Sequence, residues 1–282
     1  MLCGGKITVI CENSVAPGRA GIGEHGFAAL LETERGNYLF DTGKGEGLIG
    51  NMLAFDKDPL SIQKILLSHG HPDHTGGLAA ILDLVGEVEV WGHPDIFMTR
   101  FVLKKSGGRE EKKFAGMKFQ RAYLESLGAK FILDREFKKL TEGIYLSGEI
   151  PRKNPFETGD PRLFAEVDGR LLPDPFPDDQ SIFIQSPLGL VVLLGCAHSG
   201  TINILEYALE KTGVDRVYAV FGGTHLDFSS PAQMEETIRT LKKYQIAKIG
   251  VSHCTGPKAA SRLFHEFGDR FIFGQVGESL EF

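Results

Sequence analysis

The chain has 282 residues, 42% of them apolar, and a formal net charge of −6, which suits one large α/β domain or two small ones. The acidic balance provides no general basic field for nucleic acid or anionic membrane, and no apolar run approaches the roughly 20 residues of a membrane span. The N-terminal stretch lacks signal-peptide features, and the four cysteines show no disulfide framework. We therefore expect a cytoplasmic protein with reduced thiols whose partner is a small molecule, not nucleic acid or a membrane. Its oligomeric state stays open.

The first part of the chain is typical of a sheet of short strands followed by one helix. Apolar runs at 6–10, 27–32 and 37–40 are broken by Gly, Asn and Pro, which predicts hairpins. "KILLS" (64–68) is continuously apolar, as expected of a strand buried on both faces. "GGLAAILDLVG" then predicts a helix that ends at Gly86, and "VEVWG" predicts the next strand.

The middle of the chain, about residues 94–180, is dense in Gly, Pro and charged residues. We expect a single domain over residues 1–282, in which this segment is an inserted, cap-like elaboration over one rim of the core. Such loops often shape substrate pockets. The alternative is a solvated loop without functional consequence.

Regular alternation resumes in the last third. Strands are predicted at 181–185, 190–195, 216–223 and 248–253, with helices at 201–211, 229–245 and 256–267 between and after them. The helix after Ser230 is the best marked, because Pro231 suits its first turn and Gln233 completes a capping box. The whole pattern favours two sheets packed face to face with helices outside.

Four side chains that can bind metal follow the strand at 64–68 within six positions: His69, His71, Asp73 and His74. Residues two apart in a strand point to the same side, so His69 and His71 should reach one ion together. Asp73 and His74 fall in the following turn and should face a second point nearby. Two ions roughly 3.5–4 Å apart are usual in two-metal hydrolytic sites. The alternative is a polar turn whose histidines are merely solvated.

This segment, "SHGHPDHTGG", resembles the signature of the metallo-β-lactamase superfamily. "YLFDTG" before it and "GCAHSG" and "VSHCTG" after it stand in the superfamily's order, so the resemblance covers nearly the whole chain. The resemblance implies an α+β fold, a four-layer αββα sandwich with two mixed sheets face to face, and a site for one or two divalent ions at one sheet edge. It assigns the first ion to His69, His71 and His198, and the second to Asp73, His74 and His253. Asp41 would orient a ligand imidazole. Zinc is the first expectation, with manganese and iron as alternatives.

One departure from the superfamily pattern concerns the second ion. Most members that bind two ions have a bridging aspartate in a "GD" after the third-histidine strand, whereas "LLGCA" places Cys196 there. We therefore expect the site to bind either one ion or two ions with unequal affinity. His225 and Cys254 are candidate substrate contacts. His225 could instead be a metal ligand and Cys254 a neighbour of the metal or a reactive thiol, and a structural role is the further alternative for both. Thr255 and Gly256 precede a helix whose free N–H groups suit a phosphate.

The segments "FDTGKG", "SGEIPR" and "FGGTHL" narrow the resemblance to the branch related to 7,8-dihydropterin-6-methyl-4-(β-D-ribofuranosyl)aminobenzene-5'-phosphate synthase. This implies an enzyme that couples a pterin to a phosphate-bearing small molecule, with the metal as Lewis acid and an aromatic pocket supplied by Phe156, Phe164 and Phe176. A hydrolase of a phosphoester, ester or lactone is the alternative, with Asp73 as candidate base and Asp41 as its catalytic neighbour. A non-catalytic metal-binding or sensory protein is the third hypothesis.

Overall fold

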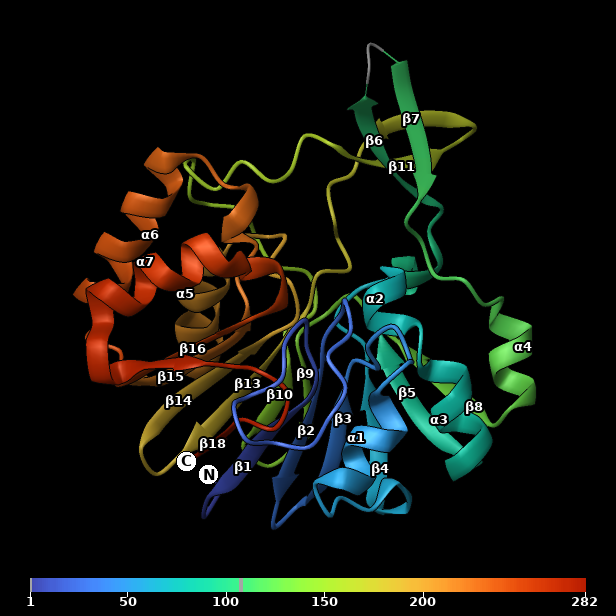
Figure 1. The fold of residues 1–282 in the computed structure, drawn as a ribbon, viewed down its shortest axis with the longest axis horizontal. Helices are drawn as coiled ribbons and strands as arrows, with labels where there is room; N and C mark the ends of the chain where they lie inside the picture. The colour runs from blue at the N-terminus through green and yellow to red at the C-terminus, as the bar shows by residue number, and fades with distance from the viewer. Residues whose placement is uncertain (1, 107–108) are drawn as a thin grey trace.

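Two seven-stranded mixed sheets pack face to face in the computed structural model, which describes residues 2–106 and 109–282 (Figure 1). The first sheet has the order β18-β1-β2-β3-β4-β5-β8 and the second the order β17-β16-β15-β14-β13-β10-β9. The strands of the first sheet are β1 (Gly5–Cys11), β2 (Ala28–Thr33), β3 (Gly36–Phe40), β4 (Ile62–Leu66), β5 (Val88–Gly92), β8 (Ala129–Leu133) and β18 (Ser279–Glu281). Those of the second are β9 (Lys138–Thr141), β10 (Ile144–Leu146), β13 (Ser181–Ser186), β14 (Gly189–Leu194), β15 (Val217–Gly223), β16 (Lys248–Ser252) and β17 (Phe271–Phe273).

Three apolar layers hold the sandwich together. Side chains such as Ile7, Phe40, Val191 and Phe221 are fully buried between the two sheets, as expected for inner faces that exclude water. A second apolar cluster lies between the first sheet and its outer helices, and a third lies between the second sheet and its outer helices. The first sheet carries α1 (Leu48–Ala54), α3 (Leu78–Val85) and α4 (Arg121–Ser126), and the second carries α5 (Thr201–Thr212), α6 (Pro231–Lys243) and α7 (Gly256–Phe267). The predicted αββα sandwich is therefore confirmed.

Parallel pairing brings distant loops to one edge of the sandwich. β3, β4, β5 and β8 run parallel in the first sheet, and β14, β15, β16 and β17 run parallel in the second. The loops that follow parallel strands emerge at the same end of a sheet, which is where open α/β sheets bind ligands. The loops after β3, β4, β14, β15 and β16 therefore share one edge.

The middle segment differs from the single insertion expected at 94–180. β8 belongs to the first core sheet and β9 and β10 to the second, so core strands interrupt the segment. The strands of the described part of this segment that leave the sandwich are β6 (Arg100–Ser106), β7 (Arg109–Phe114), β11 (Leu163–Val167) and β12 (Arg170–Pro173). They pair antiparallel in a four-stranded sheet, and β6, β7 and β11 project above the sandwich in Figure 1. That this projecting sheet acts as a cap stays a prediction.

The helix ends follow the sequence signals. The Ser230 hydroxyl accepts the Gln233 N–H at 3.1 Å at the start of α6, and Gly86 ends α3 with a φ of 72°. Across residues 2–106 and 109–282, none of the helices combines the length and the apolarity that crossing a bilayer requires.

Candidate metal centre

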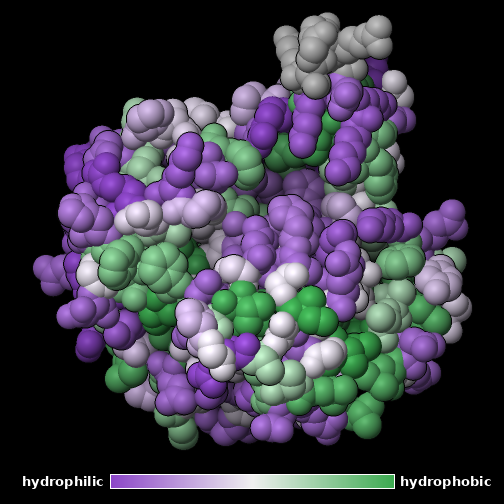
Figure 2. Space-filling view, in the orientation of Figure 1, coloured by the Kyte–Doolittle hydropathy of each residue, from purple (hydrophilic) through white to green (hydrophobic). Residues whose placement is uncertain are grey.

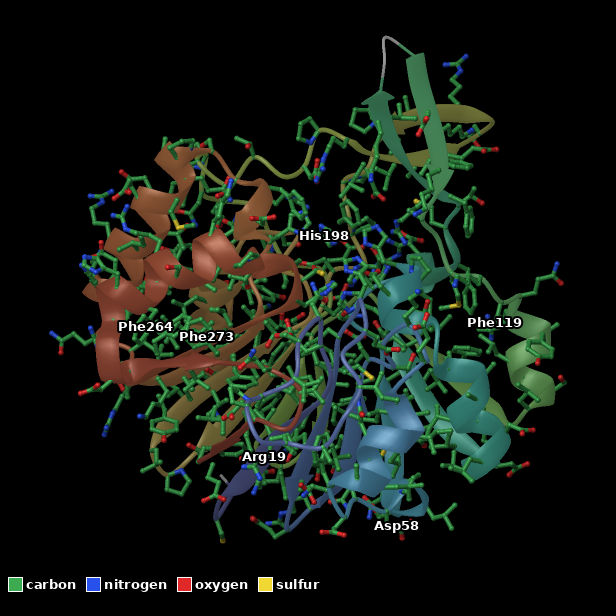
Figure 3. All side chains as sticks on the ribbon, viewed as in Figure 1. Arg19, Asp58, Phe119, His198, Phe264 and Phe273 are labelled. Carbon is green, nitrogen blue, oxygen red and sulfur yellow. The ribbon has the colours of Figure 1, made fainter. Side chains whose placement is uncertain are left out.

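Every candidate metal ligand of the sequence analysis lies at the shared edge of the two sheets. Asp41 follows β3, and His69, His71, Asp73 and His74 follow β4, the last two within the single turn of α2 (Pro72–Thr75). Cys196 and His198 follow β14, His225 follows β15, and His253 follows β16. Figure 3 places His198 in the middle of the molecule, between the halves built on each sheet. The structure thus brings together residues more than 200 positions apart in the sequence.

The local conformation around His69 and His71 differs from the expected strand. β4 ends at Leu66, so both histidines lie in the loop after it and strand alternation does not aim them. Their rings converge all the same, with His69 Nε2 and His71 Nδ1 3.0 Å apart. Gly70 makes the bend possible, because a Cβ there would collide with the Ile96 carbonyl oxygen. Its N–H donates to Asp178 Oδ2 at 2.9 Å, which fixes the loop.

His69, His71 and His198 form one group of ligand atoms, all within 4.8 Å of one another. All three side chains are buried, and the Nε2 atoms of His71 and His198 have no hydrogen-bond partner. Burial lowers the pKa of His71 to about 3 and holds the pKa values of His69 and His198 well below the ordinary value. Neutral imidazoles with unpartnered nitrogens are what a divalent transition metal binds, so this group fits an ion.

Asp73 lies at the centre of a neighbouring group. Its Oδ2 is 3.3 Å from His253 Nε2 and 3.2 Å from His25 Nε2. Although burial opposes it, hydrogen bonds from His25 and His253 hold the pKa of Asp73 well below its usual value. His25 was missed in the sequence because it is a lone histidine in the loop between β1 and β2, and only the folded chain brings it to Asp73.

Asp41 holds two of the imidazoles from the first sheet's loops in place, His74 directly and His69 through the Ser68 hydroxyl. It is fully buried, and its Oδ2 lies 2.7 Å from His74 Nδ1. It also accepts the backbone N–H and the hydroxyl of Ser68, both at 2.7 Å, and the same hydroxyl lies 2.8 Å from His69 Nδ1. Burial alone would lower the pKa of His74. The Asp41 carboxylate acts in the opposite direction, and the net result is a pKa raised to about 9. Such a carboxylate fixes ring orientation, leaving His74 Nε2 to face the cluster.

The sequence profile of the metallo-β-lactamase superfamily matches residues 21–253. This chain belongs to that superfamily. It is 32% identical to the 7,8-dihydropterin-6-methyl-4-(β-D-ribofuranosyl)-aminobenzene-5'-phosphate synthase of Methanocaldococcus jannaschii, over 98% of this chain and 96% of the relative. The crystal structure of Tm1679, a metal-dependent hydrolase of the β-lactamase superfamily, superposes with a TM-score of 0.80 at 28% identity, covering 98% of both chains. YhfI of Bacillus subtilis shares the fold, with a TM-score of 0.61 at 12% identity over 99% of this chain and all of its own.

Two buried thiols lie beside the histidine cluster. Cys196 Sγ lies 3.1 Å from His74 Nε2, and it forms a group of ligand atoms with His69 and His74. Cys254 Sγ accepts the His225 N–H at 3.3 Å and lies 3.5 Å from the Cys196 carbonyl oxygen. Cys196, which stands where the resemblance would place a bridging aspartate, therefore lies inside the cluster.

The residues expected to bind phosphate, Thr255 and Gly256, are placed differently from that expectation. The Thr255 hydroxyl is buried and bonded to Thr224, 2.9 Å from its hydroxyl. A side chain at Gly256 would collide with the Asp227 carboxylate. Because a carboxylate already lies at the start of α7, this helix end does not suit a second anion.

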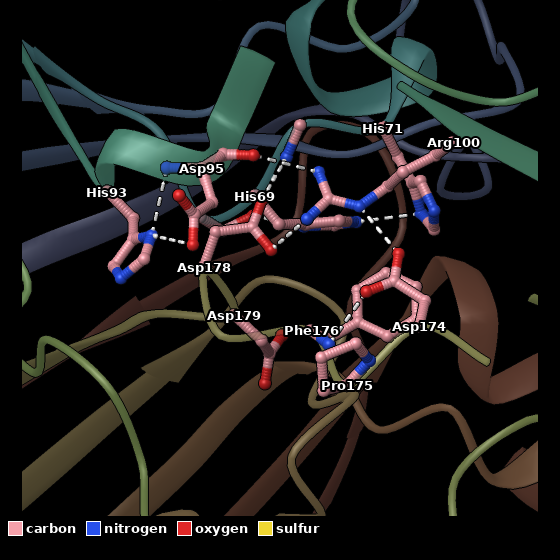
Figure 4. Close-up of polar contacts among 12 residues, drawn as sticks. His69, His71, His93, Asp95, Arg100, Asp174, Pro175, Phe176, Asp178 and Asp179 are labelled. Atoms are coloured by element: carbon pink, nitrogen blue, oxygen red, sulfur yellow. Dashed lines mark hydrogen bonds and ion pairs between the residues drawn. The ribbon is translucent and has the colours of Figure 1, made fainter. Parts of the chain in front are cut away.

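A buried ion-pair network connects the metal-binding loop to the projecting sheet (Figure 4). Arg100, at the base of β6, donates at 2.6 Å to both Asp174 and Asp178, and all three side chains are at most 1% exposed. Asp178 also accepts the Gly70 N–H between the two histidines. The position of the projecting sheet is thereby coupled to the loop that carries His69 and His71.

A recess opens beside His198 and is lined by His225, Glu157, Thr224, Phe228 and Gln233. Figure 2 shows hydrophilic surface between the projecting strands and the helices of the second sheet. Glu157 accepts the Ile202 and Asn203 N–H groups at the start of α5, and burial raises its pKa to about 7.

Of the three phenylalanines expected in an aromatic pocket, Phe176 alone stacks on a cluster histidine. Its ring lies over His198 with centroids 4.0 Å apart. Phe164 is a residue of the projecting β11, and Phe156 packs against the core of the second sheet.

Proposed function

We propose that this chain is a metal-dependent enzyme that acts on a phosphate-bearing small molecule, with a pterin-coupling reaction like that named for its archaeal relative as the leading candidate. The observation that carries the proposal is end-to-end similarity to that synthase, 32% over 98% of this chain. The matched region covers nearly the whole chain, and therefore also the segments that build the cluster.

The cluster supports a catalytic role through its donor set. His69, His71 and His198 would hold one ion. Of the residues that the resemblance assigns to a second ion, Asp73 and His253 lie 3.3 Å apart and form a group of ligand atoms with His25, whereas His74 groups with His69 and Cys196. A bound divalent ion would supply a Lewis acid or polarise water there. Asp41 keeps His74 oriented, and Asp73 is positioned between two imidazoles with its carboxylate ionised.

An exposed aromatic surface at the rim of the recess beside His198 would suit a substrate with a flat ring. The Phe228 side chain is 44% exposed, and its ring lies 4.9 Å from that of His225. The Arg162 guanidinium covers Phe228 at 4.3 Å. Aromatic rings stack favourably on such surfaces, and the polar lining would fix a ring's orientation.

Hydrolysis is the second candidate. It is supported by the likeness to Tm1679, which is described as a metal-dependent hydrolase and matches with a TM-score of 0.80. The same cluster would then direct water to a phosphoester, an ester or a lactone.

A paired assay separates the two reactions. Protein loaded with Zn²⁺, Mn²⁺ or Fe²⁺ is given a dihydropterin activated at its 6-methyl group together with β-D-ribofuranosyl-aminobenzene 5'-phosphate. In parallel it is given p-nitrophenyl phosphoesters, carboxyl esters and lactones. Product formation is followed by mass spectrometry, with chelator-treated protein as the control.

Metal-dependent coupling is the expected result. Hydrolysis of one ester class without coupling would overturn the synthase assignment in favour of the hydrolase. Failure of every reaction by fully metal-loaded protein would contradict catalysis and favour a metal-binding or sensory role.

A further inference from the structure

A second recess lies on the outer face of the first sheet, away from the metal cluster. It is formed where the edge made by β18 and β1 meets the C-terminal end of α1, and its volume is about 220 Å³. Such a volume is far more than one water molecule needs, so a small molecule can enter. Figure 3 shows Arg19, which lines this recess, well below His198. We call it the outer recess; its lining includes Lys6, Thr8, Arg19, Phe55 and Ser279.

The Thr8 hydroxyl lines the outer recess without a hydrogen-bond partner. Its neighbours Ile7 and Val9 pack between the two sheets, so the alternation of β1 turns Thr8 to the outer face. The residue is 4% exposed, and its Oγ1 has no partner within the described part of the chain. A buried hydroxyl without a partner costs free energy and is rare in stable proteins. Thr8 therefore indicates a polar group that binds in the recess.

Arg19 is the second donor in the outer recess that lacks a partner. No ion pair or hydrogen bond joins its guanidinium to another side chain within residues 2–106 and 109–282. The loop that carries it is anchored, because the Ala16 N–H donates to the Val276 carbonyl oxygen at 3.1 Å. A Cβ at Gly277 would lie 3.1 Å from Arg19 Cγ and 3.0 Å from Phe55 Cζ. Glycine at 277 thus leaves the space in which both side chains line the recess.

The charges around the outer recess favour an anion. Lys6 and its partner Glu281 are 3.5 Å apart and 40% and 77% exposed, so this pair is weak and Lys6 remains able to bind another anion. Lys57 is bonded to Glu32 at 2.6 Å and adds little further positive charge. Asp56, which is exposed, is the opposing carboxylate of the lining. Two cations are therefore available against one carboxylate.

We propose that the outer recess binds a phosphate oxyanion, either free or as the end group of a small molecule. The Arg19 guanidinium and the Lys6 ammonium would pair with its charge, and the Thr8 hydroxyl would donate to one of its oxygens. Arginine suits this role because its N–H groups match the geometry of phosphate oxygens. The site is separate from the metal cluster, and the proposal does not depend on the function proposed above.

Titration calorimetry of full-length, metal-loaded protein tests the site with inorganic phosphate and with glycerol 3-phosphate at constant ionic strength. Thr8→Val keeps the shape of the side chain and removes the hydroxyl, and Arg19→Met removes the cation. Thr237→Val is the matched control, because Thr237 is also buried with an unpartnered hydroxyl but lies on α6, outside the recess. Arg216→Met controls for the loss of an exposed cation elsewhere. Circular dichroism verifies folding.

We expect wild type to bind phosphate, and both Thr8→Val and Arg19→Met to bind it at least ~10-fold less tightly, because each loses a hydrogen bond to a charged group. The two controls should bind as wild type does. The probe that wild type binds more tightly distinguishes a free anion from a phosphate monoester.

Two further measurements sharpen the test. Asp56→Asn should bind phosphate more tightly than wild type, because it removes a like charge and asparagine tolerates the φ of 55° at this position. In phosphate-free buffer Thr8→Val should unfold at the same temperature as wild type or a higher one, since it removes an unpartnered hydroxyl. Added phosphate should raise the unfolding temperature of wild type more than that of Thr8→Val.

Phosphate binding that keeps its full strength in Thr8→Val and Arg19→Met would place the anion elsewhere, for example on the metal ions, and would overturn the site. Wild type that binds neither probe with a Kd below about 1 mM would overturn it as well. Both outcomes leave the metal-dependent function to be decided by its own assays.

Discussion

The two halves of the metal cluster are built in different ways. In the half that belongs to the first sheet, Asp41 and Ser68 bond His69 and His74 at distances of 2.7–2.8 Å, and His71 Nε2 is the ring nitrogen without a hydrogen-bond partner. In the half that belongs to the second sheet, Asn13 holds His253 at 2.9 Å, whereas His198 Nε2 has no hydrogen-bond partner and His225 Nε2 lies 3.6 Å from the Asp160 carboxylate. The first half is largely pre-oriented by the protein, and His198 and His225 of the second half would be fixed by what they bind.

This difference predicts which substitutions should lose the most free energy of metal binding. Ligands that a carboxylate already orients need little reorganisation when an ion binds. Buried nitrogens without a hydrogen-bond partner gain the most free energy when they bind the ion. We therefore expect metal binding to stabilise the second half more than the first. Four substitutions sharpen or break the comparison.

The largest effect should come from His198→Ala, in the second half. Losing one of three buried imidazoles should remove several kcal/mol of transition-state stabilisation and lower activity roughly 1,000-fold or more. Metal content by mass spectrometry should fall with it. His265→Ala, in the exposed part of α7, is the control. Full metal occupancy in His198→Ala would refute the ligand assignment.

Arg100→Met should be the most destabilising of the remaining changes. It leaves the buried carboxylates of Asp174 and Asp178 without their cation, and breaking a buried pair typically costs about 3–5 kcal/mol. Arg121→Met, which breaks an exposed pair with Glu125, should cost less than about 1 kcal/mol. Chemical denaturation measures both. Equal losses would show that the connection between the projecting sheet and the metal loop is energetically unimportant.

Asp41→Asn should weaken metal affinity about 10–100-fold while leaving the ligands in place, because it alters the partner of His74 Nδ1. Competition with a chromophoric chelator gives the affinity, and Asp83→Asn on the exposed side of α3 is the comparison. Unchanged affinity in Asp41→Asn would mean that pre-orientation does not distinguish the first half.

Glu157→Gln should give the smallest effect, visible in the pH dependence of stability. Burial raises the pKa of Glu157 to about 7 in the folded chain, above that of the unfolded chain. The folded chain therefore binds more protons, and this contribution to stability falls by ~2 kcal/mol as pH rises from about 5 to about 7. Thermal unfolding across that range should show a flatter profile in the variant. Parallel profiles would contradict the assignment of this titration to Glu157.

Much of the fold was predictable because its signals are local. The Ser230 cap of α6, the Gly86 end of α3 and the apolar run at 65–67, where β4 ends, each depend on neighbouring residues. The range 94–180 was not, because β8, β9 and β10 join the core sheets through pairing with distant strands.

The site shows the same limit. The cluster from His69 to His74 is one contiguous motif, so its residue types alone indicate a metal site. His25 lies in no motif and reaches Asp73 only through the fold. The position of Cys196 against His74 likewise depends on how the two sheets pack, which spacing in the sequence does not specify.

Diffraction from crystals of zinc-loaded protein, collected on both sides of the zinc absorption edge, tests the central claim most directly. The account predicts anomalous density within coordination distance of His69, His71 and His198, which would join the pre-oriented half to the unpartnered one. An edge of the sandwich without anomalous density, with these imidazoles turned away from one another, would contradict it.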